Sequence, residues 1–239
     1  MAHGKKHNGA DGRLFAIGDI HGCPDELEAI LKAVKPGAGD TVVFIGDYVD
    51  RGPSARDVVE RLIEFSNEPC ESVFLKGNHE DMMLSVLGLT GNYGESFLLN
   101  GGAATLESYG VDPADLERAA ERIPERHLNF FRNLAVSYLR PPYLFVHAGV
   151  MPARQLEEQS VEDLLWIRQE FIFNPHELGQ TVLFGHTPMR EVMVDLPYKI
   201  GIDTGLVYGN KLTCIELIEG TLFQVARGSR QARTSKFED

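Results

Sequence analysis

The stretch Val42-Val43-Phe44-Ile45-Gly46-Asp47-Tyr48-Val49-Asp50-Arg51-Gly52-Pro53 joins an apolar run to a polar loop. Its first four residues are apolar and three are β-branched, which predicts a strand buried on both faces. The loop that follows carries Asp47, Asp50 and Arg51 between glycines. In open α/β sheets, ligands bind at the loops that follow the carboxyl ends of the strands. We therefore predict a functional site that contains these three side chains.

The same pattern of apolar strand and polar loop occurs at four other places in the chain. Glycines in or beside these loops allow the backbone to turn tightly. After the first three strands, apolar residues at helical spacing predict helices near 27–34, 54–65 and from 76–80 onward, so we expect βαβ units and a parallel sheet. The four loops are Gly18-Asp19-Ile20-His21-Gly22, Lys76-Gly77-Asn78-His79-Glu80, His147-Ala148-Gly149 and Gly185-His186-Thr187-Pro188.

The rest of the chain divides into three kinds of segment. Residues 88–133 have no strong strand pattern, and we expect an inserted helical segment beside the active face, with helices near 113–122 and 125–133. A separate domain is the less favoured alternative because no linker is present. The second half is strand-rich, with one helical stretch near 161–171, which predicts two packed sheets. We expect one catalytic domain at 13–226, a flexible leader at 1–12 and a flexible tail at 227–239.

Composition narrows the classes of protein. The 239 residues carry a net charge of −12, which argues against a nucleic-acid binder because such binding needs clustered Lys and Arg. A small phosphorylated substrate remains compatible, since metal ions can dominate the field of a site. No apolar run approaches the ~20 residues of a membrane span, and no signal peptide is apparent, so we expect a cytoplasmic protein without membrane contact. The three cysteines follow no metal spacing and are expected to be reduced thiols.

The side chains at the strand ends are of metal-binding types. Carboxylate, amide and imidazole groups suit borderline-to-hard divalent metals, and the lack of thiolates argues against structural zinc. A single His after a strand is usually a structural residue. Five loops with metal-binding residue types, each after a buried strand, favour a metal site over that explanation. The set exceeds the needs of one ion, whereas two ions ~3.5–4 Å apart that share a carboxylate would hydrolyse phosphate esters. The candidate ligands are Asp19, His21, Asp47, Asn78, His147 and His186.

These motifs resemble the three signature motifs and the two later histidine motifs of the phosphoprotein phosphatases, within the calcineurin-like metallophosphoesterase superfamily. The resemblance spans residues 14–217, and Asp203-Thr204-Gly205 with Lys211-Leu212-Thr213 is similar to the ending of compact bacterial and phage serine/threonine phosphatases. It implies an α/β fold, an αββα sandwich of two mixed sheets flanked by helices, with a dimetal site at the carboxyl ends of strands.

The resemblance also implies roles for the motif residues. Asp19 and His21 would hold one metal, Asp47 would bridge, and Asn78, His147 and His186 would complete the second site. A bridging water or hydroxide would attack phosphorus in line. The two divalent ions are expected to be Mn²⁺, with Fe or Zn²⁺ as alternatives.

Further residues receive catalytic and substrate-binding roles. We expect His79 to protonate the leaving group rather than bind metal, with Asp50 orienting its ring. Arg51 would hold the phosphoryl oxygens through a bidentate fork. Arg168 is the candidate for a second arginine, with stacking on the neighbouring tryptophan or a surface ion pair as the alternative. Tyr208 is expected to line the pocket, with a packing role as the alternative.

Phosphorylated proteins or small phosphoesters are the expected substrates. The main hypothesis is a phosphomonoesterase for phosphoserine and phosphothreonine, with phosphotyrosine as a further substrate. The alternative is a symmetrical diadenosine tetraphosphate hydrolase, and an inactive scaffold is a minor alternative. Two residues favour the protein phosphatase. The dinucleotide hydrolases that this chain resembles usually lack an aspartate at the position of Asp50, and they usually have Asp at the position of Glu80.

Overall fold

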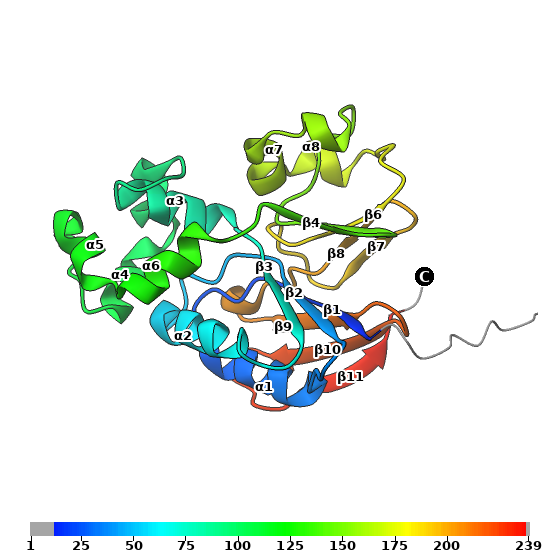
Figure 1. The fold of residues 1–239 in the computed structure, drawn as a ribbon, viewed down its shortest axis with the longest axis horizontal. Helices are drawn as coiled ribbons and strands as arrows, with labels where there is room; N and C mark the ends of the chain where they lie inside the picture. The colour runs from blue at the N-terminus through cyan, green and yellow to red at the C-terminus, as the bar shows by residue number, and fades with distance from the viewer. Residues whose placement is uncertain (1–11, 238–239) are drawn as a thin grey trace, which may run out of the picture.

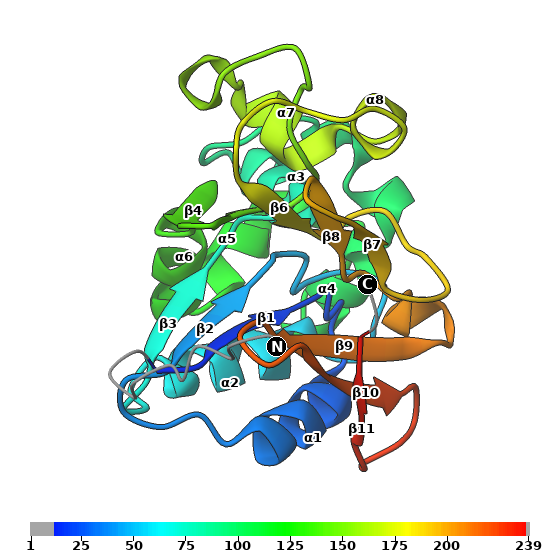
Figure 2. The ribbon, with the colours of Figure 1, turned by 90° about the vertical axis from the view of Figure 1, so that its right-hand side faces the viewer.

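Two β-sheets pack face to face, with helices on both outer sides (Figure 1). The computed structural model describes residues 12–237, so almost all of the expected leader at 1–12 lies outside the described residues. Figure 2 shows the same layers after a 90° turn, with α1 and α2 beneath one sheet and α7 and α8 above the other. This arrangement confirms the αββα sandwich of two mixed sheets.

The first sheet has six strands in the order β11-β10-β9-β1-β2-β3. Strands β1, β2 and β3 are parallel, as expected for βαβ units, whereas β9, β10 and β11 are successively antiparallel. The connecting helices are α1 (Pro24–Val34) and α2 (Ala55–Phe65). The strands are β1 (Leu14–Ile17), β2 (Thr41–Phe44), β3 (Glu71–Phe74), β9 (Lys211–Glu216), β10 (Thr221–Ala226) and β11 (Arg233–Lys236).

The second sheet has five strands in the order β4-β5-β6-β8-β7. Strands β5, β6 and β8 are parallel, and the two edge strands are antiparallel to their neighbours. Its strands are β4 (Ser137–Arg140), β5 (Tyr143–Val146), β6 (Thr181–Phe184), β7 (Met193–Asp195) and β8 (Lys199–Gly201). Because β1, β2, β5 and β6 all end at the same edge of the sandwich, the loops that follow them meet there.

We call β2 together with Ile45 the organising strand, and residues 46–53 the organising loop. The organising strand is buried on both faces because it lies between two apolar layers. Val42 and Phe44 pack toward α1 and α2, while Val43 and Ile45 pack against the second sheet, together with residues such as Phe145. Full burial of one such side chain contributes about 1.5–3 kcal/mol. The layered core therefore holds the strand ends, and with them the loops, in fixed positions.

Residues 88–133 contain helical elements and no named strand. Helix α3 (Asn78–Val86) precedes them and begins at the third loop. The helix expected at 113–122 is split into a 3-10 turn and a short α-helix. The elements are η1 (Gly94–Ser96), η2 (Leu98–Asn100), α4 (Gly102–Ser108), η3 (Leu116–Arg118), α5 (Ala119–Arg122) and α6 (Glu125–Arg132).

Two other expectations need correction. The helical stretch at 161–171 is divided into α7 (Val161–Trp166) and α8 (Gln169–Ile172), with Arg168 in the break. The expected flexible tail contains β11, which pairs with β10 from Thr221↔Lys236 to Gln224↔Arg233. Every β11 residue is exposed, so backbone pairing forms this strand and no apolar alternation marked it in the sequence. The remaining one-turn elements are η4 (Leu156–Glu158) and η5 (Leu206–Tyr208).

Within residues 12–237, no helix combines the length and apolar character needed to cross a membrane.

Candidate metal centre

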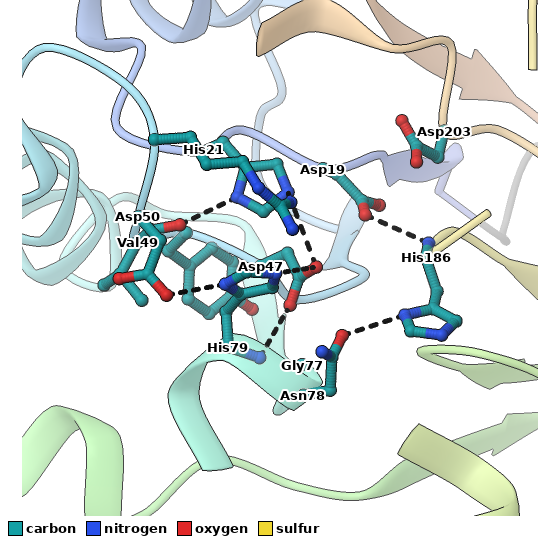
Figure 3. Close-up of polar contacts among 12 residues, drawn as sticks. Asp19, His21, Asp47, Val49, Asp50, Gly77, Asn78, His79, His186 and Asp203 are labelled. Carbon is teal, nitrogen blue, oxygen red and sulfur yellow. Dashed lines mark hydrogen bonds and ion pairs between the residues drawn. The ribbon is translucent and has the colours of Figure 1, made fainter. Parts of the chain in front are cut away.

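The loops that follow β1, β2, β3 and β6 converge at one edge of the sandwich (Figure 3), and the loop that follows β5 meets them there. Asp19 and His21 follow β1, and Asp47 follows β2. Asn78 begins α3, directly after the loop that follows β3. His147 and His186 follow β5 and β6 and complete the set of six expected ligands. All six side chains are at most 4% exposed.

Asp47 lies at the centre and belongs to two groups that could each hold a metal ion. One group is Asp47 with His21 and His79, and the other is Asp47 with His147 and His186. The Asp47 Oδ2 atom is 3.5 Å from His21 Nε2, and Oδ1 is 3.3 Å from His147 Nε2. Its two oxygens therefore face different groups, as a bridging carboxylate requires.

Hydrogen bonds behind the two imidazoles direct their lone pairs into the site. His21 Nδ1 lies 2.8 Å from the Val49 carbonyl, and His147 Nδ1 lies 2.9 Å from the Ile45 carbonyl. A carbonyl oxygen can only accept, so both Nδ1 atoms carry a proton, and in the neutral ring each Nε2 atom is left to present a lone pair to the site. Such a bond behind the ring is typical of metal-binding histidines.

Asn78 links the two histidines of the second group, and two further buried atoms of the cluster lack a partner within residues 12–237. The Asn78 Oδ1 atom is 3.1 Å from His147 Nε2 and 2.8 Å from His186 Nδ1. Asp19 Oδ1 and His186 Nε2 are buried without a hydrogen-bond partner among the described residues. Such a buried carboxylate oxygen and imidazole nitrogen fit a cation, so these residues fit the divalent metals that the motifs imply.

Burial and neighbouring charges shift the pKa values of the cluster in opposite directions. Burial raises the pKa of Asp19 well above its usual range, and the charge of Asp203 adds to the effect. Burial lowers the pKa of His21 to about 3. Burial alone would also lower the pKa of His147, but the adjacent Asp47 carboxylate raises it to about 9. A divalent cation here would supply the charge that a proton on His147 otherwise supplies.

Backbone strain is concentrated at the site. Seven non-glycine residues in the described chain have positive φ, and five of them lie here: His21, Asp47, Asp50, Arg51 and His186. Such conformations each cost about 1–3 kcal/mol and persist only where surrounding contacts enforce them.

Gly77 is required by close packing, since a Cβ there would lie 2.1 Å from Asp47 Oδ1. The third loop can therefore approach the organising loop only with glycine at this position.

Glu80 joins two of the loops, a role that was not expected from the sequence. Its buried carboxylate accepts backbone N–H bonds from Asp47 at 2.9 Å, Tyr48 at 2.7 Å and Gly77 at 2.8 Å, with Val49 at 3.2 Å. The one local signal is the capping box, because Glu80 is the third residue of α3. Its contacts with the organising loop depend on the fold.

His79 forms a buried pair with Asp50. The His79 Nδ1 atom lies 2.6 Å from Asp50 Oδ2, and the Thr105 hydroxyl donates to Asp50 Oδ1 at 2.6 Å. The Asp50 backbone N–H donates to the same hydroxyl at 2.8 Å. Thr105 belongs to α4 and was not foreseen from the sequence, because 55 residues separate it from Asp50.

The remaining expected residues lie around this cluster. Arg51 Nη1 is 2.9 Å from His21 Nε2, and its guanidinium lies 5.5 Å from the centre of the Tyr208 ring, which is 63% exposed. Arg168 donates to the His186 carbonyl at 3.0 Å and to the Thr187 hydroxyl at 3.3 Å. Its charge helps burial to lower the pKa of His186, which is consistent with its position beside the second group.

The inserted segment reaches across to α7 next to the second group. The Tyr93 hydroxyl donates to Glu162 at 2.6 Å, and its ring meets Trp166 edge-on at 4.9 Å between centres. The Trp166 ring is 6.4 Å from that of His186. The insert thus contacts the site both here and through Thr105.

An αββα sandwich with a shared aspartate between two groups of metal-binding side chains is the architecture of a metallophosphoesterase. The chain belongs to this family: the family model for calcineurin-like phosphoesterases matches residues 12–212.

Relatives over nearly the full length have two kinds of named activity. The chain is 26% identical to a bis(5'-nucleosyl)-tetraphosphatase PrpE [asymmetrical] of Oceanobacillus iheyensis, over 92% of this chain and 93% of the relative. It is 29% identical to serine/threonine-protein phosphatase 1 of Salmonella typhimurium, over 84% and 89%. A solved structure of a candidate diadenosine tetraphosphatase is 25% identical, with a TM-score of 0.67 and coverage of 92% and 95%.

Proposed function

We propose that this chain is a metal-dependent phosphoesterase whose preferred substrates are dinucleoside polyphosphates. The reaction class, metal-dependent hydrolysis of a phosphoester, is supported mainly by one observation: Asp47 belongs to both groups of metal-binding side chains. The substrate class is supported by the Oceanobacillus relative and by the solved structure of the candidate diadenosine tetraphosphatase, each matching about nine-tenths of both chains. The dinucleotide alternative is therefore better supported than the protein phosphatase favoured from the motifs.

The six expected ligands would hold two divalent ions, for which we propose Mn²⁺. Bound there, the ions would polarise the phosphoryl oxygens and make a water molecule more acidic. Arg51 would orient the phosphoryl group through its planar fork, since its Nη1 already faces the His21 side of the site. Arg168 would do so from the His186 side after exchanging its present bonds to His186 and Thr187.

His79 and Asp50 would supply the proton for the leaving group. One proton lies between Asp50 Oδ2 and His79 Nδ1, because these atoms are 2.6 Å apart. Burial raises the pKa of Asp50, which favours a second proton on the pair. Burial lowers the pKa of His79 to about 4, so its ring is neutral near pH 7, and with a protonated Asp50 against Nδ1 its own proton would lie on Nε2, 3.9 Å from Asp47 Oδ2.

The same pair favours a second candidate function, the hydrolysis of phosphoserine and phosphothreonine in proteins. A serine alkoxide is a poor leaving group and needs a proton, whereas a nucleoside phosphate leaves readily without one. The similarity to serine/threonine-protein phosphatase 1 points the same way.

The test is a comparison of kcat/KM with Mn²⁺-loaded protein on diadenosine tetraphosphate, a phosphothreonine peptide and a phosphotyrosine peptide. We expect the dinucleotide to be preferred. Chromatography of its products distinguishes symmetrical cleavage to two ADP from asymmetrical cleavage to ATP and AMP. Preference for a phosphopeptide would establish the second candidate, and turnover of none of the three would contradict an enzymatic role.

A further inference from the structure

A cavity of about 500 Å³ lies beside Arg51, outside the metal-binding groups. One wall is formed by residues 51–53 of the organising loop and another by Ala104, Glu107 and Ser108 of α4. Arg227, just after β10, closes a third side. Here it is called the Arg227 cavity. Its volume lies within the range of about 300–1,000 Å³ that is usual for small-molecule sites.

Arg51 connects this cavity to the candidate metal centre. Arg51 lines the cavity, and its Nη1 atom is 2.9 Å from His21 Nε2. Its backbone N–H donates to Gly101 at the start of α4, which fixes the loop against the cavity wall. A ligand whose phosphate is held at Arg51 can therefore extend directly into the Arg227 cavity.

Arg227 is fixed in place with donors to spare. Its Nη1 atom donates at 2.6 Å to Glu26, which is 1% exposed and also accepts the Gly228 N–H at 2.7 Å. Within residues 12–237, Glu26 is the one hydrogen-bond partner of the Arg227 side chain. A guanidinium has five N–H donors, so most of them remain for a ligand.

The charges and surfaces of the cavity select a particular ligand chemistry. In a chain of net charge −12, two arginines and one acid, Glu107, line the cavity, and the buried Glu26 is paired with one of the arginines, Arg227. Pro53 and Ala104 add apolar wall. Guanidinium groups beside apolar surface suit phosphates that are joined to a nucleoside.

We propose that the Arg227 cavity binds the portion of a nucleoside polyphosphate that lies beyond the scissile phosphate. The phosphates extend from Arg51 toward Arg227, and the nucleoside lies against Pro53 and Ala104. This inference rests on the proposed function and defines where its substrate is recognised.

The test fills the cavity without altering the metal centre. Ala104→Trp places an indole in the cavity, and Ala33→Trp, on an exposed position of α1, is the matched control. For Ala104→Trp we expect KM for diadenosine tetraphosphate to rise at least about tenfold, about 1.4 kcal/mol. The Ki of ADP, as an inhibitor of p-nitrophenyl phosphate turnover, should rise by a similar factor. Turnover of p-nitrophenyl phosphate itself should stay within about twofold, which also shows that the variant is folded.

A second variant changes the charge of the cavity and should lower KM for the dinucleotide, whereas Ala104→Trp should raise it. Glu107→Gln removes the acid that faces the arginines, so KM for the dinucleotide should fall about two- to threefold, in line with an exposed charge pair. Glu64→Gln, at an exposed position of α2, controls for net charge.

Two results with Ala104→Trp would overturn the proposal: unchanged KM and Ki, or an equal loss on p-nitrophenyl phosphate. Failure of the proposed function is separate, since it would be the absence of dinucleotide turnover by the unaltered protein. In that case a raised Ki for ADP in Ala104→Trp would still identify the cavity as a nucleotide site.

Discussion

At the scale of single residues, Asp47 is the side chain on which both metal groups depend. Asp47→Asn removes the charge shared between them and introduces N–H donors among acceptors. We expect metal content to fall below two ions per chain, and activity to fall by more than the roughly 10–100-fold that loss of an outer partner costs. Metal analysis together with kinetics measures both. Asp50→Asn is the control and should retain its metals; two ions and full activity in Asp47→Asn would disprove the bridging role.

A variant at His79 distinguishes a role in proton transfer from a role in metal binding. His79→Asn removes the Nε2 proton, so turnover of an alkyl phosphate should fall about 100- to 10,000-fold. Turnover of p-nitrophenyl phosphate should fall far less, because p-nitrophenolate leaves without protonation. Metal content should stay unchanged; its loss would place His79 among the ligands, as its distance of 3.9 Å from Asp47 Oδ2 would permit. Equal losses on both substrates would contradict the acid role.

At the scale of elements, Glu80 fixes the start of α3 against the organising loop. Glu80→Gln replaces a carboxylate that accepts four backbone N–H groups with an amide whose N–H₂ opposes some of them. We expect a loss of about 2 kcal/mol in the free energy of unfolding, since hydrogen bonds to charged groups contribute about 1.5–3 kcal/mol. For a chain of this size that lowers Tm by about 4–8 °C, measurable by calorimetry.

Glu64→Gln changes the same functional group at an exposed position of α2 and should leave Tm unchanged. A Glu80→Gln variant as stable as its parent would show that the loops hold their positions without this carboxylate.

The elements also show what the sequence could predict. Buried strands, the glycine-rich loops and the six ligand-type residues are local patterns, and the structure brings these residues together. Thr105 and β11 depend on contacts that no local pattern encodes: Thr105 meets Asp50 across 55 residues, and β11 is an exposed edge strand. The substrate class was hardest to predict, because Asp50 and Glu80 serve the geometry of the loops whichever phosphoester is bound.

At the scale of the whole molecule, the metal centre couples ligand binding to stability. Asp19, Asp47 and Asp203 are buried near one another, and burial together with the charge of the other two raises the pKa of Asp19. Cations that bind the folded chain relieve this repulsion, and at a free concentration 100 times Kd they stabilise it by about 2.7 kcal/mol. Adding Mn²⁺ after chelation should therefore raise Tm by about 5–10 °C, measured by differential scanning fluorimetry. Asp47→Asn should show a much smaller rise, because its two groups no longer share a charged ligand. If Tm of the unaltered chain is the same in chelator and in Mn²⁺, the cluster of acceptors is not a metal site, and its repulsion must be relieved by protons on Asp19 and His147.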